Sequence, residues 1–291
     1  MAPGTFEWVP RNRRKGGLTL VLLAAVVALG AGVYVAVRHV PAILGETGCT
    51  AGTGRAAAAL DAQQAQIAAT IAGVAHHRGM PPRALTVAYA TAMQETHLHD
   101  PDYGDLDSVG VFQQRPSQGW GPASKLIDPV YASTRFFRAL AQIPGYRQMP
   151  VYKAAQAVQH SADGYAYQQY QPLAAHLTSA FTGASPRAVW CWPAANAAGR
   201  AQLAPARRAI VKAFGPLPVS RAASGGDPPS LLVRASQPSL GWAVAAWLVT
   251  HAGTYRLHQV RYAGFQWPAP AGHTGWSKDA GTAPAGTVQA S

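Results

Sequence analysis

The sequence predicts a mainly α protein: an N-terminal transmembrane helix, then a helical domain, then a small C-terminal α+β domain. Three observations lead to this fold class. Residues 18–37 contain no charge, and this stretch has the length that a helix needs to cross a bilayer. Apolar residues recur at helical spacing through residues 61–185. Only residues 198–277 combine a helical stretch with an alternating, strand-like one.

The N-terminal segment is interpreted as a membrane anchor. Residues 1–17 carry a cluster of Arg and Lys, and basic flanks stay on the cytoplasmic side of a membrane. A cleavable signal peptide is the competing interpretation, but its apolar core would be shorter and a small-x-small cleavage site would follow. We therefore expect residues 1–17 to be cytoplasmic, residues 18–37 to form a single-pass anchor in the cell membrane, and the bulk of the chain to be extracytoplasmic.

Residues 38–60 are expected to form a linker, because Pro, Gly and Thr interrupt them. The chain has two cysteines, Cys49 and Cys191, and they bracket the helical domain. Thiols oxidise outside the cytoplasm, so we predict a disulfide between them, contributing about 4–5 kcal/mol at most through the long loop that it closes. The alternatives are two unrelated cysteines, or Cys49 as a lipid site, which its distance from the apolar stretch disfavours.

A glutamate lies near the end of the helix predicted over Pro82 to Thr96. The apolar residues of this helix recur at i, i+3, i+4, i+7 and i+8 from Leu85. At about 100° per residue, Glu95 lies beside Ala88 and Ala92, at the edge of the buried stripe. Burial and the negative end of the helix dipole both raise the pKa of a carboxyl, which suits a general acid. The alternative is a solvated glutamate on an exposed turn.

A polar loop and a compact turn follow Glu95. The loop carries four aspartates, Asp100, Asp102, Asp105 and Asp107. The last three could supply a second carboxylate that activates water, as an inverting glycosidase requires. Asp and Gly runs are also ordinary turn formers, so some of these residues are expected only to fold the loop.

These residues resemble the lysozyme-like superfamily, especially soluble lytic transglycosylases and goose-type lysozymes. Gln94-Glu95-Thr96 is similar to the family's helix end, where a catalytic Glu is usually followed by Ser. Gly110-Val111-Phe112-Gln113 is similar to its Gly-Leu-Met-Gln turn, and Pro116 follows as the family's proline does. The resemblance covers residues 60–180, and it implies a lysozyme-like helical domain over residues 61–185.

The resemblance also implies roles for individual residues. Glu95 would be the catalytic acid, with no metal and no cofactor. The family's Ala-Tyr-Asn-Ala-Gly segment is matched by residues 157–161, where Gln159 stands for the Asn but Val158 replaces the Tyr. Tyr165 or Tyr167 could supply the missing contact, although either could be a core residue. The expected glycan-binding residues are Asp107, Ser108, Gln113, Gln114, Gln159 and Tyr165.

Residues 198–277 are expected to form a small α+β accessory domain. The helical WLVTHA and the strand-like HQVRYAGFQW resemble the carboxy-terminal domain often joined to cell-wall enzymes and related to D-Ala-D-Ala peptidases. Its histidines, His251, His258 and His273, lack the spacing of zinc ligands, so we expect a non-catalytic module. Residues 278–291 are rich in Gly, Thr, Ala and Pro and are expected to be disordered.

Charge is unevenly distributed and limits the possible partners. Residues 186–291 hold ten Lys or Arg and two Asp, whereas residues 55–185 hold nine Lys or Arg and eight acidic residues. The basic region suits anionic wall polymers or lipid headgroups, and a solvated basic surface is the plain alternative. Nucleic acid would also suit the charge, but an extracytoplasmic location argues against it.

Together these features predict a membrane-anchored enzyme that cleaves the β-1,4 bond of peptidoglycan glycan strands, as a lytic transglycosylase or a muramidase, for local opening of the wall. The alternative is a catalytically inactive scaffold that binds peptidoglycan within a secretion or DNA-transfer apparatus, and the Val158 departure motivates it. A peptidase acting through the C-terminal domain is disfavoured, because its sequence lacks the zinc-binding motif.

Overall fold

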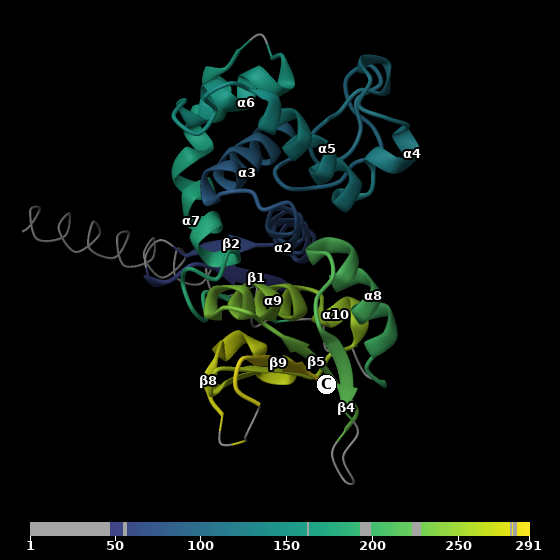
Figure 1. Cartoon of the computed structure of the whole chain (residues 1–291), viewed down its shortest axis with the longest axis vertical. Helices are drawn as coiled ribbons and strands as arrows, with labels where there is room; N and C mark the ends of the chain where they lie inside the picture. The colour runs from purple at the N-terminus through teal and green to yellow at the C-terminus, as the bar shows by residue number, and fades with distance from the viewer. Residues whose placement is uncertain are drawn as a thin grey trace, which may run out of the picture. The chain divides into compact units, whose positions relative to one another are not determined.

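The computed structural model describes residues 47–54, 57–161, 163–192, 199–222, 228–279, 281 and 284–291. The chain from Gly45 to Ser291 forms one compact unit. In Figure 1 one part of this unit is a cluster of helices, labelled α2 to α7, and the other part is a sheet with helices α8 to α10 above it.

The helical part begins at local sequence signals that the chain supplies itself. Asp61 caps α2 through a capping box with Gln64, and Asp128 caps α5 ahead of a proline at its first position. The predicted helix over Pro82 to Thr96 is confirmed at both ends. The helices are α2 (Ala62–His77), α3 (Pro82–Thr96), α4 (Ala123–Leu126), α5 (Pro129–Gln142), α6 (Val151–Gln159) and α7 (Gln171–Phe181), with short 3-10 turns η2 (Pro116–Gln118) and η3 (Tyr165–Tyr170).

A three-stranded antiparallel sheet ties together the two ends of the helical part. Strand β1 (Gly48–Ala51) lies between β2 (Ala58–Leu60) and β3 (Val189–Trp192). Cys49 of β1 lies directly opposite Cys191 of β3, and the predicted disulfide joins them. Part of the expected linker is therefore two strands of a sheet.

The C-terminal part is built on a six-stranded antiparallel sheet in the order β4-β5-β9-β6-β7-β8. The strand β9 comes from the segment expected to be disordered, yet it pairs with both β5 and β6, and its Val288 and Ala290 are fully buried. The strands are β4 (Val219–Ala222), β5 (Ser230–Arg234), β6 (Gln259–Tyr262), β7 (Phe265–Pro268), β8 (Ser277–Lys278) and β9 (Thr287–Ala290), and the helices are α8 (Leu203–Phe214), α9 (Pro238–Thr250), α10 (Ala252–Tyr255) and the 3-10 turn η4 (Ala269–Thr274).

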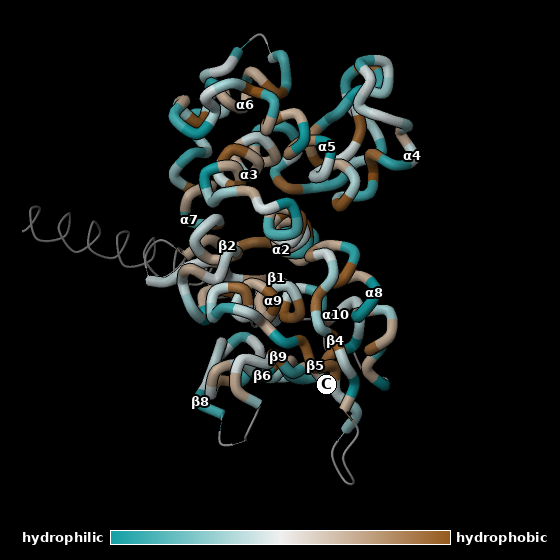
Figure 2. The backbone as a smooth tube through the Cα atoms, viewed as in Figure 1, coloured by the Kyte–Doolittle hydropathy of each residue, from teal (hydrophilic) through white to brown (hydrophobic). Residues whose placement is uncertain are grey.

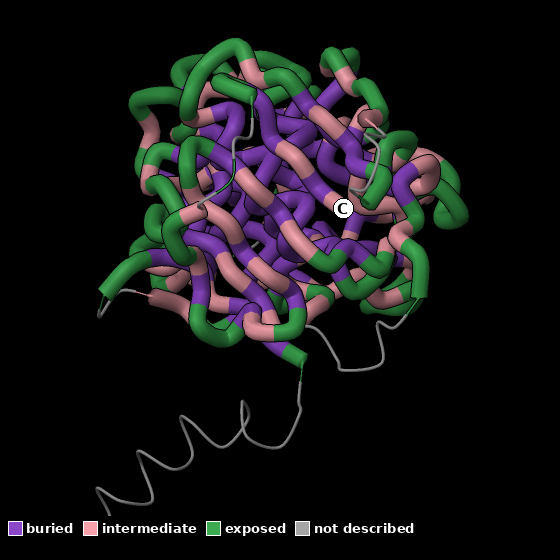
Figure 3. The backbone as a smooth tube through the Cα atoms, turned by 90° about the horizontal axis from the view of Figure 1, so that it is seen from below, coloured by how far each residue is buried: buried purple, intermediate pink, exposed green. Residues whose placement is uncertain are grey.

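Helix α9 joins the two parts into one core. Every residue from Leu240 to Thr250 is buried, as expected of a helix that is hydrophobic on all sides. It packs against α2 and α7 of the helical part and against β6 and β9 of the six-stranded sheet. Figure 2 shows hydrophobic residues around α2 and α9, and Figure 3 shows the buried residues inside a rim of exposed ones.

The predicted mainly α fold class is wrong for the residues that the structure describes, because they include two sheets. The physical reason is that the missed strands are short and have remote partners. Strand β1 pairs with β3, which lies more than a hundred residues later in the chain. Such pairings leave no periodic signal within a local window of sequence.

The single-pass membrane anchor expected from the sequence is not supported. Within the described part of the chain, no helix is both long enough and apolar enough to cross a bilayer. Residues 18–37, on which that expectation rested, lie outside the described residues, as do residues 1–17. The cell-membrane location inferred from the anchor is therefore withdrawn as well.

Candidate functional site

Glu95 is the second-last residue of α3, where the helix meets the polar loop. His97 caps the C-terminal end of the helix with a left-handed backbone (φ 54°), and the N–H groups of His97 and Leu98 donate back to the carbonyls of Met93 and Ala92. All residues from Val87 to Met93 are buried, whereas Glu95 is half-buried. The carboxyl therefore lies at the border between the core and the surface, as the helical spacing predicted.

Two side chains from later in the chain hold the same oxygen of Glu95. The hydroxyl of Tyr167 donates to Oε1 at 2.8 Å, and Nε2 of Gln159 donates to Oε1 at 3.1 Å. Gln159 also donates to the carbonyl oxygen of Phe112 at 2.8 Å. The structure thus brings together the predicted acid, the predicted amide and the turn after the aspartate loop.

The environment of Glu95 shifts its titration toward neutrality. Burial raises the pKa of Glu95, and the hydrogen bonds from Tyr167 and Gln159 lower it by less. The pKa of Tyr167 is also raised, first by burial and then by the negative charge of Glu95. A carboxyl whose protonated form is favoured in this way has the property required of a general acid.

The turn from Gly110 to Gln113 is fixed to the end of α3. Gly110 has φ 75°, and a Cβ there would overlap the carbonyl of Leu126, so glycine is required. The Thr96 hydroxyl donates to the carbonyl oxygen of Val111 at 2.9 Å. The turn therefore lies against the residue that follows Glu95.

Two of the loop aspartates have opposite electrostatic surroundings. Asp107 accepts hydrogen bonds from Arg115 Nε at 2.8 Å and from the Ser117 backbone at 2.7 Å, and these contacts lower the pKa of Asp107 to about 2. Asp100 is half-buried, and burial raises its pKa to about 7, with a smaller contribution from the charge of Asp128. Asp107 is therefore held in an ion pair with Arg115. Asp100 was given no separate role from the sequence.

The other predicted glycan-binding residues differ in how far their side chains are buried. Gln114 and Ser108 are buried, and Gln114 donates to the carbonyl of Ala132 in α5 at 3.3 Å, so these side chains support the turn. Gln113 is held within the loop by the carbonyls of Tyr103 and Gly110. Tyr165 is 69% exposed and stacks on Tyr152, with ring centroids 4.8 Å apart.

Tyr167 is the residue that the sequence left undecided. Tyr165 and Tyr167 were the two candidates to replace the tyrosine that the resembled family has at the position of Val158. In the structure Tyr167, not Tyr165, bonds to Glu95. Val158 is buried and takes no part in the site. A run of tyrosines in residues 165–170 was the available signal, but only the three-dimensional structure distinguishes the buried ring from the exposed one.

A separate cavity of about 540 Å³ lies between α2, β3 and α10, away from Glu95. It is lined by amide, hydroxyl, aromatic and guanidinium side chains together with the disulfide, including Gln66, Trp192 and Arg256. No carboxylate is among its described lining residues, so it offers no general acid.

No protein-family model matches the chain, and no curated protein matches it either.

Proposed function

We propose that the protein cleaves the β-1,4 bond of peptidoglycan glycan strands, with Glu95 as the general acid. The observation that carries this proposal is the half-buried carboxyl of Glu95, held by Tyr167 and Gln159 beside the turn at Phe112. Its raised pKa keeps a proton available nearer neutral pH than an ordinary glutamate does.

The contacts of Glu95 assign the proton to one oxygen. The hydrogen bonds from Gln159 and Tyr167 are both accepted by Oε1, so the proton of the neutral carboxyl belongs on Oε2. From there it passes to the glycosidic oxygen as the bond to the sugar breaks. The anionic Glu95 then takes the proton of the hydroxyl group that attacks the sugar, which restores the acid.

The attacking group is the sugar's own hydroxyl in this proposal, which gives an anhydro end. Hydrolysis with inversion would instead need a second carboxylate to activate water. Asp107 is engaged by Arg115 and Ser117, which removes it from that role, while Asp102 and Asp105 lie on the exposed side of the loop. The exposed rings of Tyr103 and Tyr165 offer surfaces on which sugars can stack.

The test is digestion of purified sacculi, followed by separation and mass measurement of the released fragments. Glu95→Gln keeps the shape of the side chain but cannot transfer a proton, and we expect it to lower cleavage by about 10²–10⁴-fold. Asp105→Asn is the matched control, because it removes one carboxylate from the exposed loop, and we expect it to retain substantial activity. The products are expected to carry anhydro ends.

Other outcomes lead to different conclusions. Full activity of Glu95→Gln would exclude Glu95 as the acid and remove the basis of the enzyme proposal. Products with reducing ends, together with loss of activity in Asp105→Asn, would favour hydrolysis. Binding of wild-type protein to sacculi without any released fragment would favour the scaffold.

A further inference from the structure

The chain directly after Glu95 adopts an unfavourable backbone. His97 and Leu98 both have positive φ angles, 54° and 61°. For residues other than glycine each such conformation costs about 1–2 kcal/mol, and it persists only where the surroundings enforce it. Leu98 is fully buried, which anchors this reversal of the chain beneath the end of α3.

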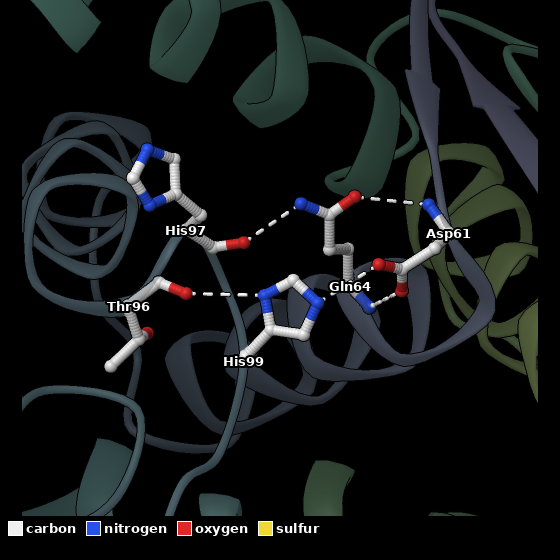
Figure 4. Close-up of polar contacts among 5 residues, drawn as sticks. All are labelled: Asp61, Gln64, Thr96, His97 and His99. Carbon is white, nitrogen blue, oxygen red and sulfur yellow. Dashed lines mark hydrogen bonds and ion pairs between the residues drawn. The ribbon is translucent and has the colours of Figure 1, made fainter.

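The start of α2 supplies the side chains that hold this reversal. Gln64 Nε2 donates to the carbonyl of His97 at 2.8 Å. Asp61 divides its carboxylate between two tasks: Oδ1 accepts from the backbone N–H of Gln64 at 2.8 Å, and Oδ2 lies 2.9 Å from Nε2 of His99. The other ring nitrogen of His99 lies 3.1 Å from the carbonyl oxygen of Thr96. Figure 4 shows the imidazole between these two oxygens.

The chemistry of these contacts limits how many of them each protonation state of His99 can make. A backbone carbonyl and a carboxylate both accept hydrogen bonds and cannot donate. A neutral imidazole has one N–H, so it can satisfy Thr96 or Asp61 but not both. Only the doubly protonated imidazolium donates to both oxygens at once, and the Asp61 contact is then an ion pair.

We propose that His99 and Asp61 are positioning residues for Glu95, acting through an imidazolium that bridges Asp61 and the carbonyl of Thr96. The bridge holds Thr96 from one side, while the Thr96 hydroxyl is held by Val111 on the other. Since Thr96 is the next residue after Glu95, losing the bridge loosens the carboxyl relative to Tyr167 and Gln159. This proposal rests on the proposed function for its kinetic consequence.

Other titratable groups near His99 are turned elsewhere. The ring of His97 meets Tyr170 edge-on, and its Nε2 lies 3.3 Å from the Tyr170 hydroxyl. Asp100 lies against the turn at Gly110: its Oδ1 would be 3.4 Å from a Cβ added to that glycine. Among the described side chains that bond to the His99 ring, Asp61 alone carries a charge.

The experiment combines NMR with cleavage kinetics on the full chain. Nitrogen-15 spectra of labelled histidine report directly whether both ring nitrogens of His99 carry protons, with His99→Gln identifying the signal. In wild-type protein we expect both ring nitrogens to carry protons under the conditions of the cleavage assay. In Asp61→Asn, which keeps an oxygen for the Gln64 N–H but removes the charge, we expect only one protonated nitrogen under the same conditions, because the introduced amide can donate to the other.

The kinetic arm compares His99→Gln with wild type across pH. Glutamine can donate to only one of the two oxygens, so we expect cleavage to fall about tenfold where wild-type His99 is protonated. Above its titration the wild type has also lost one bond, and the deficit is expected to vanish. His176→Gln is the matched control, because this exposed histidine of α7 is expected to change neither readout.

Two results would overturn the proposal. One is a His99 ring with a single protonated nitrogen under conditions where His99→Gln shows its deficit. The other is a deficit of His99→Gln that is the same at every pH, since a purely structural role would behave in that way. If wild-type protein releases no glycan fragment, the proposed function fails and with it the kinetic role, while the NMR titration still decides whether the bridge exists.

Discussion

The two parts of the molecule treat their buried ionisable groups differently. In the helical part, Glu95 is half-buried beside hydrogen-bond donors, and burial raises its pKa. In the C-terminal part, His251 stacks on Trp247 with ring centroids 3.8 Å apart, and burial lowers its pKa to about 4. The shift of Glu95 favours the protonated carboxyl, whereas the shift of His251 favours the neutral imidazole.

The surroundings of Glu95 suit proton transfer, whereas those of His251 suit a structural role. His251 caps the C-terminal end of α9 and donates from Nδ1 to the carbonyl of Trp247, so this ring nitrogen helps to close the helix. Glu95 is instead held by residues from two other elements, η3 and α6, and borders the surface. The helical part therefore carries the candidate reaction, and the C-terminal part stabilises the core that both parts share.

The largest expected effect is on the C-terminal packing. Trp267 is fully buried in β7 and its Nε1 donates to the carbonyl of Cys191 at 3.1 Å. We expect Trp267→Ala to lower the free energy of unfolding by about 3–5 kcal/mol, measured by urea titration with circular dichroism. Trp267→Phe is the control that keeps a ring but loses the hydrogen bond, and it should cost less. Loss of less than about 1 kcal/mol would show that the parts do not depend on this contact.

A smaller effect is expected at the site itself. Tyr167→Phe removes the donor on Oε1 of Glu95, which raises the pKa of Glu95 further because that hydrogen bond lowers it. We expect cleavage to fall about tenfold, from the loss of one hydrogen bond to a charged group, and its alkaline limb to move to higher pH. Tyr165→Phe, on the exposed ring nearby, is the control for the pH profile. An alkaline limb that moves to lower pH would contradict the assignment of Tyr167.

A third effect, of similar size to the second, concerns stability and pH. The pKa of Asp100 is raised to about 7 in the folded protein, so the stability linked to its neutral form is present at low pH and is lost as the pH rises through 7. We expect Asp100→Asn to unfold like wild type at pH 4 and to be more stable by about 1–2 kcal/mol at pH 8, since partial exposure reduces the full linkage. Urea titrations at both values measure this, with Asp105→Asn as the control. Equal stabilities at pH 8 would exclude a buried neutral carboxyl.

Much of the helical part was predictable from sequence because its signals are local. Pro82 and Asp128 lie at helix starts, and the apolar spacing placed Glu95 at the edge of its buried stripe. Strand β9 was not predictable in the same way. Its Gly- and Pro-rich surroundings are typical of disorder, and Val288 is buried only because β5 and β6 leave a position between them.

The candidate site also combines features that the sequence predicts with features that depend on remote contacts. Glu95 and Gln159 were predictable from motif order, and they meet in the structure. The burial of Gln114 and the ion pair of Asp107 were not predictable. Gln114 is buried against Ala132, and Asp107 pairs with Arg115, and both contacts form only in the folded chain. Polar residues in a loop look alike in sequence, and the fold decides which of them face solvent.

The disulfide between Cys49 and Cys191 has a mechanical consequence. The two cysteines are separated by 142 residues, and the whole helical part lies within that interval. Tension applied between the segment before Cys49 and the segment after Cys191 passes through the sulfur–sulfur bond, so the enclosed helices carry no load. Reduction would release roughly 500 Å of extensible chain, and pulling single molecules with and without a reductant would measure that hidden length.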